Sequence, residues 1–308
     1  MQCAGIWKQE SLREPITALA TNTATPESLR QVALESLAAL GGGTSGKQLR
    51  TLATGKLPAS ARLQALTALV ALDPATAAEL LPDVLSRTGP GTDASSLTRA
   101  FLARKQGPAI LARALVEKKL PEDQAKLALR VIDASGRKLP GLVAALQKAG
   151  GLKTGPRTLT PRQMQKLVTE VIEQGDAARG ETVFRRKDLA CLACHAIGGA
   201  GGRVGPDLVS LGASAPIDYL ADSLLAPNRK VKENYHSLVV VTKQGKVVTG
   251  IKLRQTDSDL VLCDANDREI AVPRKSIDEQ VAGSSLMPTG LIENLTRGEL
   301  VDLIRFLS

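Results

Sequence analysis

Two cysteines and a histidine stand close together in the second half of the chain, as Cys191-Leu-Ala-Cys194-His195. Two thiols three residues apart can each add to a vinyl group of one porphyrin, and an imidazole directly after them can bind the iron. The chain has four cysteines and two histidines, and three of these six residues stand in the required order. The sequence therefore predicts one covalent haem c, attached through Cys191 and Cys194 and ligated by His195.

Two other kinds of site use a similar pair of cysteines. A structural zinc site needs two further cysteine or histidine ligands, and the remaining Cys3, Cys263 and His236 form no second close pair. A redox-active dithiol of the thioredoxin type is expected in a βαβ context, whereas helical patterns precede this motif. Cys263 lies in an apolar run, where a buried, unreactive thiol is expected. Haem attachment is therefore the preferred interpretation.

The residues around the motif resemble the cytochrome c family. Four segments carry the resemblance, to the N-terminal helix, the haem-side loop, the loop of the sixth ligand and the C-terminal helix of that family: Gly175–Phe184, Gly205-Pro-Asp-Leu208, Ser285-Leu-Met-Pro288 and Thr296–Leu307. The resemblance implies that the backbone carbonyl of Pro206 accepts a hydrogen bond from the His195 imidazole, which orients a metal-bound ring. It also implies that Met287 is the second axial ligand of the iron.

The spacing departs from that of small cytochromes c, because His195 and Met287 are 92 residues apart. An insertion at about residues 231–283 accounts for the excess. Together with Tyr219–Asn228 and the Ser-Leu-Met-Pro sequence, it closely resembles the planctomycete-type haem-binding domain, over about residues 160–308. That domain often ends long exported proteins whose earlier parts are dehydrogenase-like propellers and HEAT repeats.

Three residues compete for the sixth position on the iron. Met287 is preferred. His236 is the only other histidine, and Met164 lies on an apolar helical stripe, where methionine usually fills core space. A His195/Met287 pair predicts one-electron transfer, as the acceptor or relay of a dehydrogenase. An open sixth site predicts a haem-based sensor or a peroxidase-like protein, and a third possibility is an interaction scaffold whose haem is vestigial.

Apolar stripes at helical spacing recur through the first half of the chain, with a repeat of about 30 residues. They lie at Arg30–Leu40, Arg62–Leu72, Leu97–Gln106 and Gln124–Ser135, with second helices such as Pro74–Ser86 and Leu139–Ala149 between them. The copies resemble HEAT repeats, and an irregular helical bundle is the alternative. We therefore expect a mainly α fold, with a HEAT-like α-solenoid over residues 1–155 and a cytochrome c-like helical domain over residues 160–308.

Inside the second domain the apolar residues change from helical spacing to the short runs that are typical of strands. Four short β-branched runs separated by turn residues predict a four-stranded antiparallel meander: Leu238–Thr242, Lys246–Leu253, Leu260–Cys263 and Glu269–Val272. Helices are expected on both sides of it. Asp176 is a helix N-cap, and Thr296 with Glu299 forms a capping box. Gly180, in the middle of a helix, suggests a close approach to the C-terminal helix, with Phe184 and Phe306 nearby.

The positive charge of the chain is concentrated in its first half. Residues 1–150 contain 19 lysines and arginines against 12 acidic residues, whereas residues 151–308 contain 21 against 19. The basic residues are scattered singly among apolar ones, and few aromatic side chains are available to stack on bases, which disfavours nucleic-acid binding. We expect instead that the basic half docks an acidic redox partner or a dehydrogenase domain.

The N-terminal residues 1–20 carry charges of both signs and no apolar segment, which is unlike a signal peptide. No run of about 18 apolar residues, the length of a membrane-spanning helix, is found in the chain. The family resemblance nevertheless implies haem attachment outside the cytoplasm. We therefore expect a periplasmic or otherwise exported protein, and either this chain is the C-terminal part of a longer exported protein or its coding sequence begins upstream of Met1.

Overall fold

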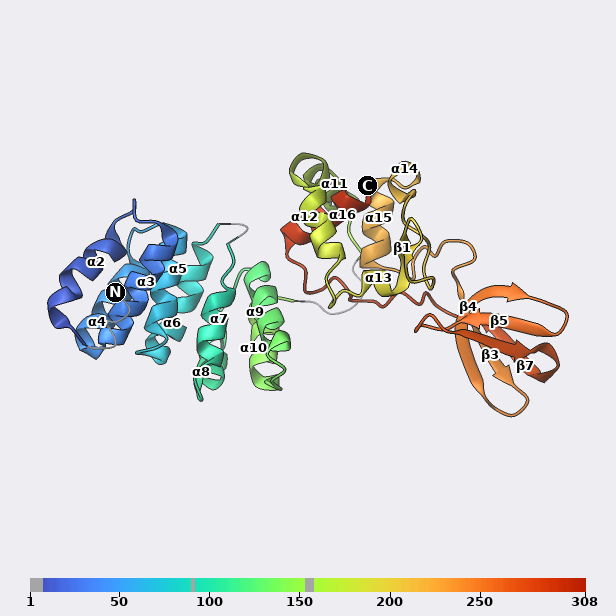
Figure 1. The fold of residues 1–308 in the computed structure, drawn as a ribbon, viewed down its shortest axis with the longest axis horizontal. Coiled ribbons are helices and arrows are strands. Elements are labelled where there is room, and N and C mark those ends of the chain that lie inside the picture. The colour runs from blue at the N-terminus through green and yellow to red at the C-terminus, as the bar shows by residue number, and fades with distance from the viewer. Residues whose placement is uncertain (1–7, 90–91, 153–157) are drawn as a thin grey trace. The chain divides into compact units, whose positions relative to one another are not determined.

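The computed structural model describes residues 8–89, 92–152 and 158–308. The fold is mainly helical, with 53% of the described residues in helices and a small antiparallel sheet. The chain divides into two units, residues 1–153 and 154–308 (Figure 1). Within the described residues, no helix is long and apolar enough to cross a membrane.

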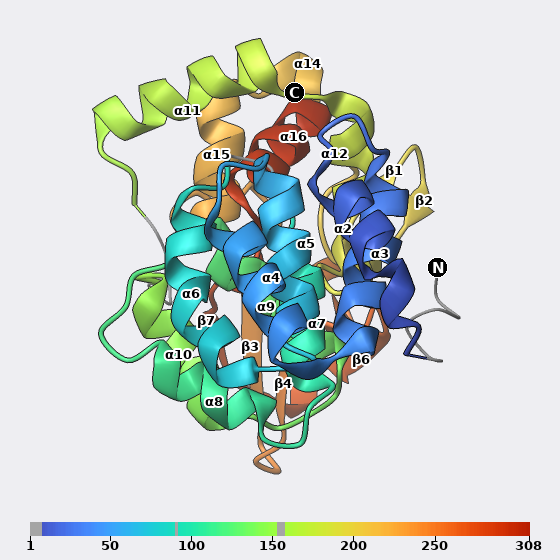
Figure 2. The same ribbon diagram turned by 90° about the vertical axis from the view of Figure 1, so that its left-hand side faces the viewer.

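Successive helices of the first unit pack against one another in two rows. After a 3₁₀ turn at Glu10–Leu12, the helices are α2 (Arg13–Thr21), α3 (Glu27–Leu40), α4 (Gly42–Thr54), α5 (Ala59–Leu69), α6 (Pro74–Ser86), α7 (Ser95–Leu102), α8 (Gly107–Ala114), α9 (Glu122–Ala134) and α10 (Pro140–Ala149). One row is formed by α3, α5, α7 and α9, and the other by α4, α6, α8 and α10. Figure 2 looks onto the first helices of these rows.

The core of the first unit repeats with the helices. Leu34, Leu66, Leu97 and Leu129 occupy equivalent positions in α3, α5, α7 and α9, at intervals of 31 or 32 residues, and all four are buried. Polar contacts also join neighbouring helix pairs. For example, the Arg104 guanidinium donates to the backbone carbonyl oxygen of Ala71, 33 residues earlier, at 2.8 Å. Each helix pair is thus stabilised mainly by the pair before it and the pair after it.

Two helices of the first unit depend on more than local sequence. The helix α4 contains Gly42, Gly43 and Gly46, and glycine is a poor helix former. The apolar stripe Leu97–Gln106 was expected to form one helix, but α7 ends at Leu102 and Gly107 begins α8. In both cases packing against neighbouring helices outweighs the weak helical propensity of the sequence.

The helical part of the second unit surrounds one apolar core. Its helices are α11 (Pro161–Gln174), α12 (Ala177–Phe184), α13 (Cys191–Cys194), α14 (Leu211–Ser214), α15 (Ile217–Leu225) and α16 (Arg297–Leu307). The C-terminal helix α16 contacts α11, α12 and α15. Leu167, Phe184, Leu303 and Ile304 are among the residues buried where these helices meet.

The helices α12 and α16 approach each other closely at Gly180. A Cβ atom on Gly180 would lie 1.9 Å from the backbone carbonyl oxygen of Asp302, so only glycine fits there. The Phe184 and Phe306 rings pack beside this contact, with their centroids 5.4 Å apart. The close approach expected from a glycine in the middle of a helix is confirmed.

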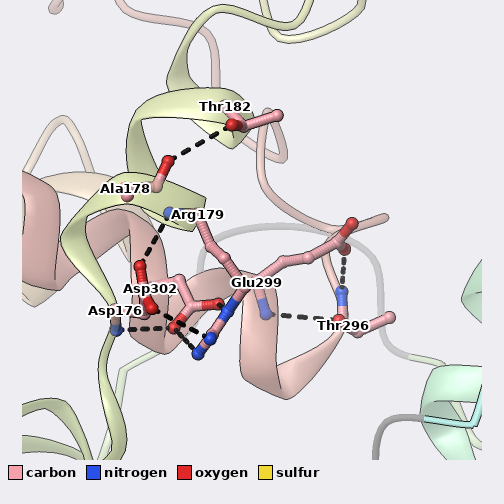
Figure 3. Close-up of polar contacts among 7 residues, drawn as sticks. All are labelled: Asp176, Ala178, Arg179, Thr182, Thr296, Glu299 and Asp302. Atoms are coloured by element: carbon pink, nitrogen blue, oxygen red, sulfur yellow. Dashed lines mark hydrogen bonds and ion pairs between the residues drawn. The ribbon is translucent and has the colours of Figure 1, made fainter.

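Polar contacts brace the same helix pair (Figure 3). Arg179 donates two hydrogen bonds to the buried carboxylate of Asp302, at 2.8 and 3.0 Å, and the backbone N–H of Asp176 donates a third at 2.8 Å. The expected N-cap at Asp176 and the expected capping box of Thr296 and Glu299 are both present. The orientation of α16 is therefore set by apolar packing and by a charge-assisted hydrogen-bond network.

The second unit contains a short antiparallel pair, β1 (Ala196–Ile197) and β2 (Ala200–Gly201), and a larger sheet of five strands. The five strands are β3 (Ser237–Thr242), β4 (Val247–Gln255), β5 (Asp259–Cys263), β6 (Glu269–Pro273) and β7 (Ile277–Ala282), in the spatial order β6-β5-β4-β3-β7. The four predicted strands are present, but the prediction of only four was wrong. The missed strand β7 pairs with β3 at the edge, and only Ile277 of it is not fully exposed, so its sequence lacks a buried apolar alternation.

Candidate haem site

The cysteine motif occupies a single helical turn. Ala190 adopts a left-handed conformation (φ 52°), which is uncommon for a residue other than glycine, and turns the chain into α13. Cys191 and Cys194 lie three residues apart in this turn, so both thiols face the same side. His195 leaves the helix in extended backbone, with φ −111° and ψ 144°. The motif thus presents two thiols and an imidazole next to one another.

The imidazole of His195 is held in one orientation. Its Nδ1 lies 2.9 Å from the backbone carbonyl oxygen of Pro206. A carbonyl oxygen only accepts hydrogen bonds, so Nδ1 carries the proton and Nε2 keeps its lone pair. Burial also lowers the pKa of His195 below its usual value, although the bond to Pro206 opposes this shift. A neutral ring with a free Nε2 is the form that binds a metal.

Two glycines allow the loop after the motif to approach it closely. A Cβ atom on Gly205 would lie 2.4 Å from Cε1 of the His195 ring, and a Cβ atom on Gly202 would lie 2.0 Å from the backbone carbonyl oxygen of Ala193. The backbone of this loop therefore packs directly against the imidazole and against the cysteine turn.

Asp207 braces the same loop, a role that the sequence analysis did not assign. Its carboxylate accepts hydrogen bonds from the backbone N–H groups of Gly198, Gly199 and Val209, at 2.7 to 3.1 Å. These bonds, the one from Val209 first, lower the pKa of Asp207. Because Asp207 directly follows Pro206, these hydrogen bonds also help to fix the position of the Pro206 carbonyl group. An Asp side chain in a loop often accepts a hydrogen bond from the backbone two residues further on, as Asp207 does from Val209. The sequence does not reveal the other two bonds, from Gly198 and Gly199.

The two thiols of the motif are half-buried. Burial is the largest influence on both, and it raises the pKa of Cys191 and of Cys194 above the usual value for a thiol. The third described cysteine, Cys263, is buried in β5, and burial together with a hydrogen bond to Asp267 raises its pKa to about 11. Cys263 therefore lies inside the sheet as an unreactive thiol, whereas the motif thiols face a cavity.

One cavity brings together the residues that were predicted from the sequence. Cys191, Cys194, His195, Pro206 and Met287 all line it, although almost one hundred residues separate the first from the last. The cavity contains about 1470 Å³ of space, including its open mouth. Its walls are largely apolar and combine residues that are far apart in the sequence: Phe184, Val204, Leu208, Leu220, Leu224, Ile251, Leu286, Leu291, Leu303 and Leu307.

The candidates for the sixth ligand lie in different places. Met287 is half-buried and lines the cavity that contains His195. His236 is exposed and is not among the residues that line this cavity. Met164 belongs to α11 and packs against the helical core. Of the three, Met287 is therefore the residue that shares a cavity with the histidine of the motif.

The mouth of the cavity carries cations that the sequence analysis missed. Lys230 and Lys232 line the cavity and are exposed, and Nζ of Lys230 lies 5.8 Å from the centroid of the Tyr219 ring. The carboxylate of Asp207, the acidic group of the lining, is already satisfied by three backbone N–H groups. The cavity is thus apolar inside and positively charged at its mouth.

The cavity residues match what a c-type haem requires. The porphyrin needs apolar walls, its two vinyl groups need two adjacent thiols, its iron needs an imidazole and a second ligand, and its propionates are stabilised by cations. Comparison with models of protein families and with curated proteins finds no match for this chain. The assignment of a function therefore rests on the residues and their geometry.

Proposed function

We propose that residues 160–308 form a c-type cytochrome domain that carries one covalent haem c and transfers single electrons. The observation that carries this proposal is the single apolar cavity lined by Cys191, Cys194, His195, Pro206 and Met287. When bound, haem supplies an iron that gains or loses one electron at a potential set largely by its axial ligands.

Each residue has a separate task in this proposal. Cys191 and Cys194 would hold the porphyrin through thioether bonds, and His195 would bind the iron through Nε2. Pro206 keeps the imidazole oriented through its carbonyl oxygen, which lies 2.9 Å from Nδ1. Met287 would supply the second ligand of the iron, and a thioether favours a higher potential than a second imidazole. The apolar walls exclude water, which also affects the potential.

The packing of the second unit supports a cytochrome c-like fold. Its helix α12, which corresponds to the N-terminal helix of the resemblance, and its C-terminal helix α16 cross at Gly180, and both contribute residues to the wall of the cavity. The two rows of helices in the first unit, with leucines repeating every 31 or 32 residues, support a HEAT-like α-solenoid. The proposed architecture is therefore a solenoid followed by an electron-transfer domain with a β insertion.

The basic first unit suggests the kind of redox partner. Arg113, Lys118 and Lys119 are exposed and close together in the sequence. Not every cation of the unit is available, because Arg30 and Arg62 are buried and donate to backbone carbonyl groups. We propose that the exposed cations dock an acidic dehydrogenase domain or another acidic redox protein, for which the chain acts as electron acceptor or relay.

Covalent attachment also bears on where the protein works. In the family that the chain resembles, haem is joined to the thiols outside the cytoplasm, so we propose a periplasmic or otherwise exported protein. Expression behind a heterologous signal peptide, together with a haem-maturation system, should yield haem-loaded protein in the periplasm. Haem loading that is just as complete in the cytoplasm would contradict this part of the proposal.

The axial pair is tested by substituting Met287. The parent protein should show six-coordinate, low-spin iron. The Met287→Ala variant should have a lower reduction potential and should bind carbon monoxide readily in the ferrous state, because its sixth position is open. A matched control is Met164→Ala, which removes a methionine from α11 and should leave the spectrum and the potential unchanged.

Two results would contradict the proposal in different ways. If Met287→Ala had the spectrum and the potential of the parent, Met287 would not be the ligand. If the parent itself showed five-coordinate, high-spin iron, electron transfer would be the wrong function, and a haem-based sensor or a peroxidase would be favoured.

A further inference from the structure

Two chain segments connect the helical part of the second unit to the five-stranded sheet, and both line the haem cavity. The first, residues 226–236, leads into β3, and the second, residues 283–288, leaves β7. The cavity-lining residues of the two segments are Pro227, Lys230, Val231, Lys232 and Tyr235, and Ser285, Leu286, Met287 and Pro288. The candidate sixth ligand is thus carried by the segment that leaves the sheet.

The two segments are joined where the sheet ends. The ladder between β3 and β7 reaches its last pair at Leu238 and Ala282. One residue further, the backbone N–H of Gly283 donates to the carbonyl oxygen of Ser237 at 2.7 Å. The Ser237 hydroxyl donates to the carbonyl oxygen of Ser284 at 2.6 Å. The pairing of the two strands is therefore extended beyond the sheet by a buried serine.

The contact between Ser237 and the second segment is tight. A Cβ atom on Gly283 would lie 2.3 Å from the Ser237 hydroxyl oxygen, so a larger residue at 283 would displace that hydroxyl. Hydrogen bonds of buried groups are costly to leave unmade. The position of Ser284 is accordingly tied to that of β3.

A second bond lies closer to Met287. The backbone N–H of Ser285 donates to Oδ1 of Asn228 at 2.8 Å, across 57 residues of sequence. The Ser285 hydroxyl in turn accepts a hydrogen bond from the backbone N–H of Met287 at 3.1 Å. Asn228 directly follows Pro227, which lines the cavity. A chain of two hydrogen bonds therefore links this wall of the cavity to the backbone of the methionine.

We propose that Asn228 and Ser237 are positioning residues that hold the Met287 loop at the haem cavity, Ser237 from the first residue of β3 and Asn228 from the segment that leads into this strand. This inference rests on the proposed His195/Met287 pair. A thioether is a neutral ligand on a flexible side chain, and the time that it spends on the iron depends on how firmly its backbone is held. The β insertion thereby gains a role in holding the proposed sixth ligand.

The test compares variants of the full, haem-loaded chain. In Asn228→Ala the Ser285 N–H loses its acceptor. The fraction of ferric protein that lacks the absorption band of methionine-ligated iron should rise about two- to tenfold, the ratio expected for one lost hydrogen bond. Amide hydrogen exchange of residues 283–288, measured by mass spectrometry on the same samples, should become faster. Ser237→Ala should act in the same direction.

Two further variants separate positioning from general damage. Asn228→Asp keeps an acceptor oxygen for the Ser285 N–H and should retain both the band and the slow exchange. Asn266→Ala removes an exposed asparagine side chain from the turn before β6 and should resemble the parent. A band in Asn228→Ala that matches the band of the parent would overturn the proposal, as would an equal loss of the band in Asn228→Asp. A band that survives Met287→Ala would instead overturn the axial pair itself.

Discussion

The two units of this chain are stabilised by contacts of very different sequence separation. In the first unit the side chain of Arg104 reaches the carbonyl of Ala71, about one repeat away. In the second unit Arg179 reaches Asp302 across 123 residues. A change in the first unit should therefore affect mainly the neighbouring helix pairs, whereas a change in the second should affect the proposed haem cavity from a distance.

The largest expected difference between the units comes from two helical glycines. Gly180→Ala places a methyl group against the backbone of α16, 1.9 Å from the Asp302 carbonyl oxygen. Overpacking of this kind should lower the free energy of unfolding of the second unit by about 1–3 kcal/mol. Denaturant unfolding followed by haem absorbance should show this loss.

Gly46→Ala is the matched control in the first unit. Nothing lies within 4 Å of a Cβ atom at this position in α4, so alanine should raise the stability of the first unit by about 0.5–1 kcal/mol. Circular dichroism should report this change without a shift in the haem transition. Equal effects of the two substitutions would contradict the contrast between the units.

The same contrast explains what the sequence could predict. The helix Pro74–Ser86 was predicted with the bounds that the structure has, because its apolar period and its N-terminal proline are local signals. The edge strand β7 was missed, since it is almost entirely exposed. The cysteine motif could also be recognised from the sequence, because its three residues lie within five positions of one another. In contrast, Asn228 and Asp302 act through contacts across 57 and more than 120 residues, and no single-chain pattern identifies such partners.

A smaller effect is expected from acid, through the N-cap of α6. The Asp73 carboxylate accepts hydrogen bonds from the Thr76 hydroxyl and the Thr76 backbone N–H, and these bonds lower the pKa of Asp73. Because the folded state has the lower pKa, this contribution to stability is full above the ordinary aspartate pKa of about 3.9 and is lost as the pH falls through the folded value.

Substitution of Asp73 by asparagine should remove this pH dependence. Asparagine caps a helix about as well as aspartate at neutral pH. Thermal unfolding of the first unit should therefore be similar in the parent and in Asp73→Asn at about pH 7, and below about pH 4 the parent should lose more stability. An acid loss of the same size in both proteins would show that other carboxylates dominate.

Substitution of exposed cations in the first unit should leave the structure almost unchanged and should alter only the rate of electron transfer. Reversing the charge of Arg113, Lys118 and Lys119 to glutamate should slow electron transfer from an acidic redox protein by about tenfold at low ionic strength, because steering is lost. Added salt should slow the parent in the same way. Charge reversal of Lys243 and Lys246, in the turn between β3 and β4, is the control. Rates that are indifferent to salt and to both sets of substitutions would mean that the basic unit docks no acidic partner.

The most direct test of the central claim is the mass of the denatured chain after expression with a haem-maturation system. The parent should carry one haem that survives acid–acetone extraction, and a variant with both Cys191→Ala and Cys194→Ala should carry none. A matched Cys263→Ala variant should keep its haem, since that thiol is buried in the sheet and does not line the cavity. A parent chain from which extraction removes all haem, or to which none is ever attached, would contradict the account.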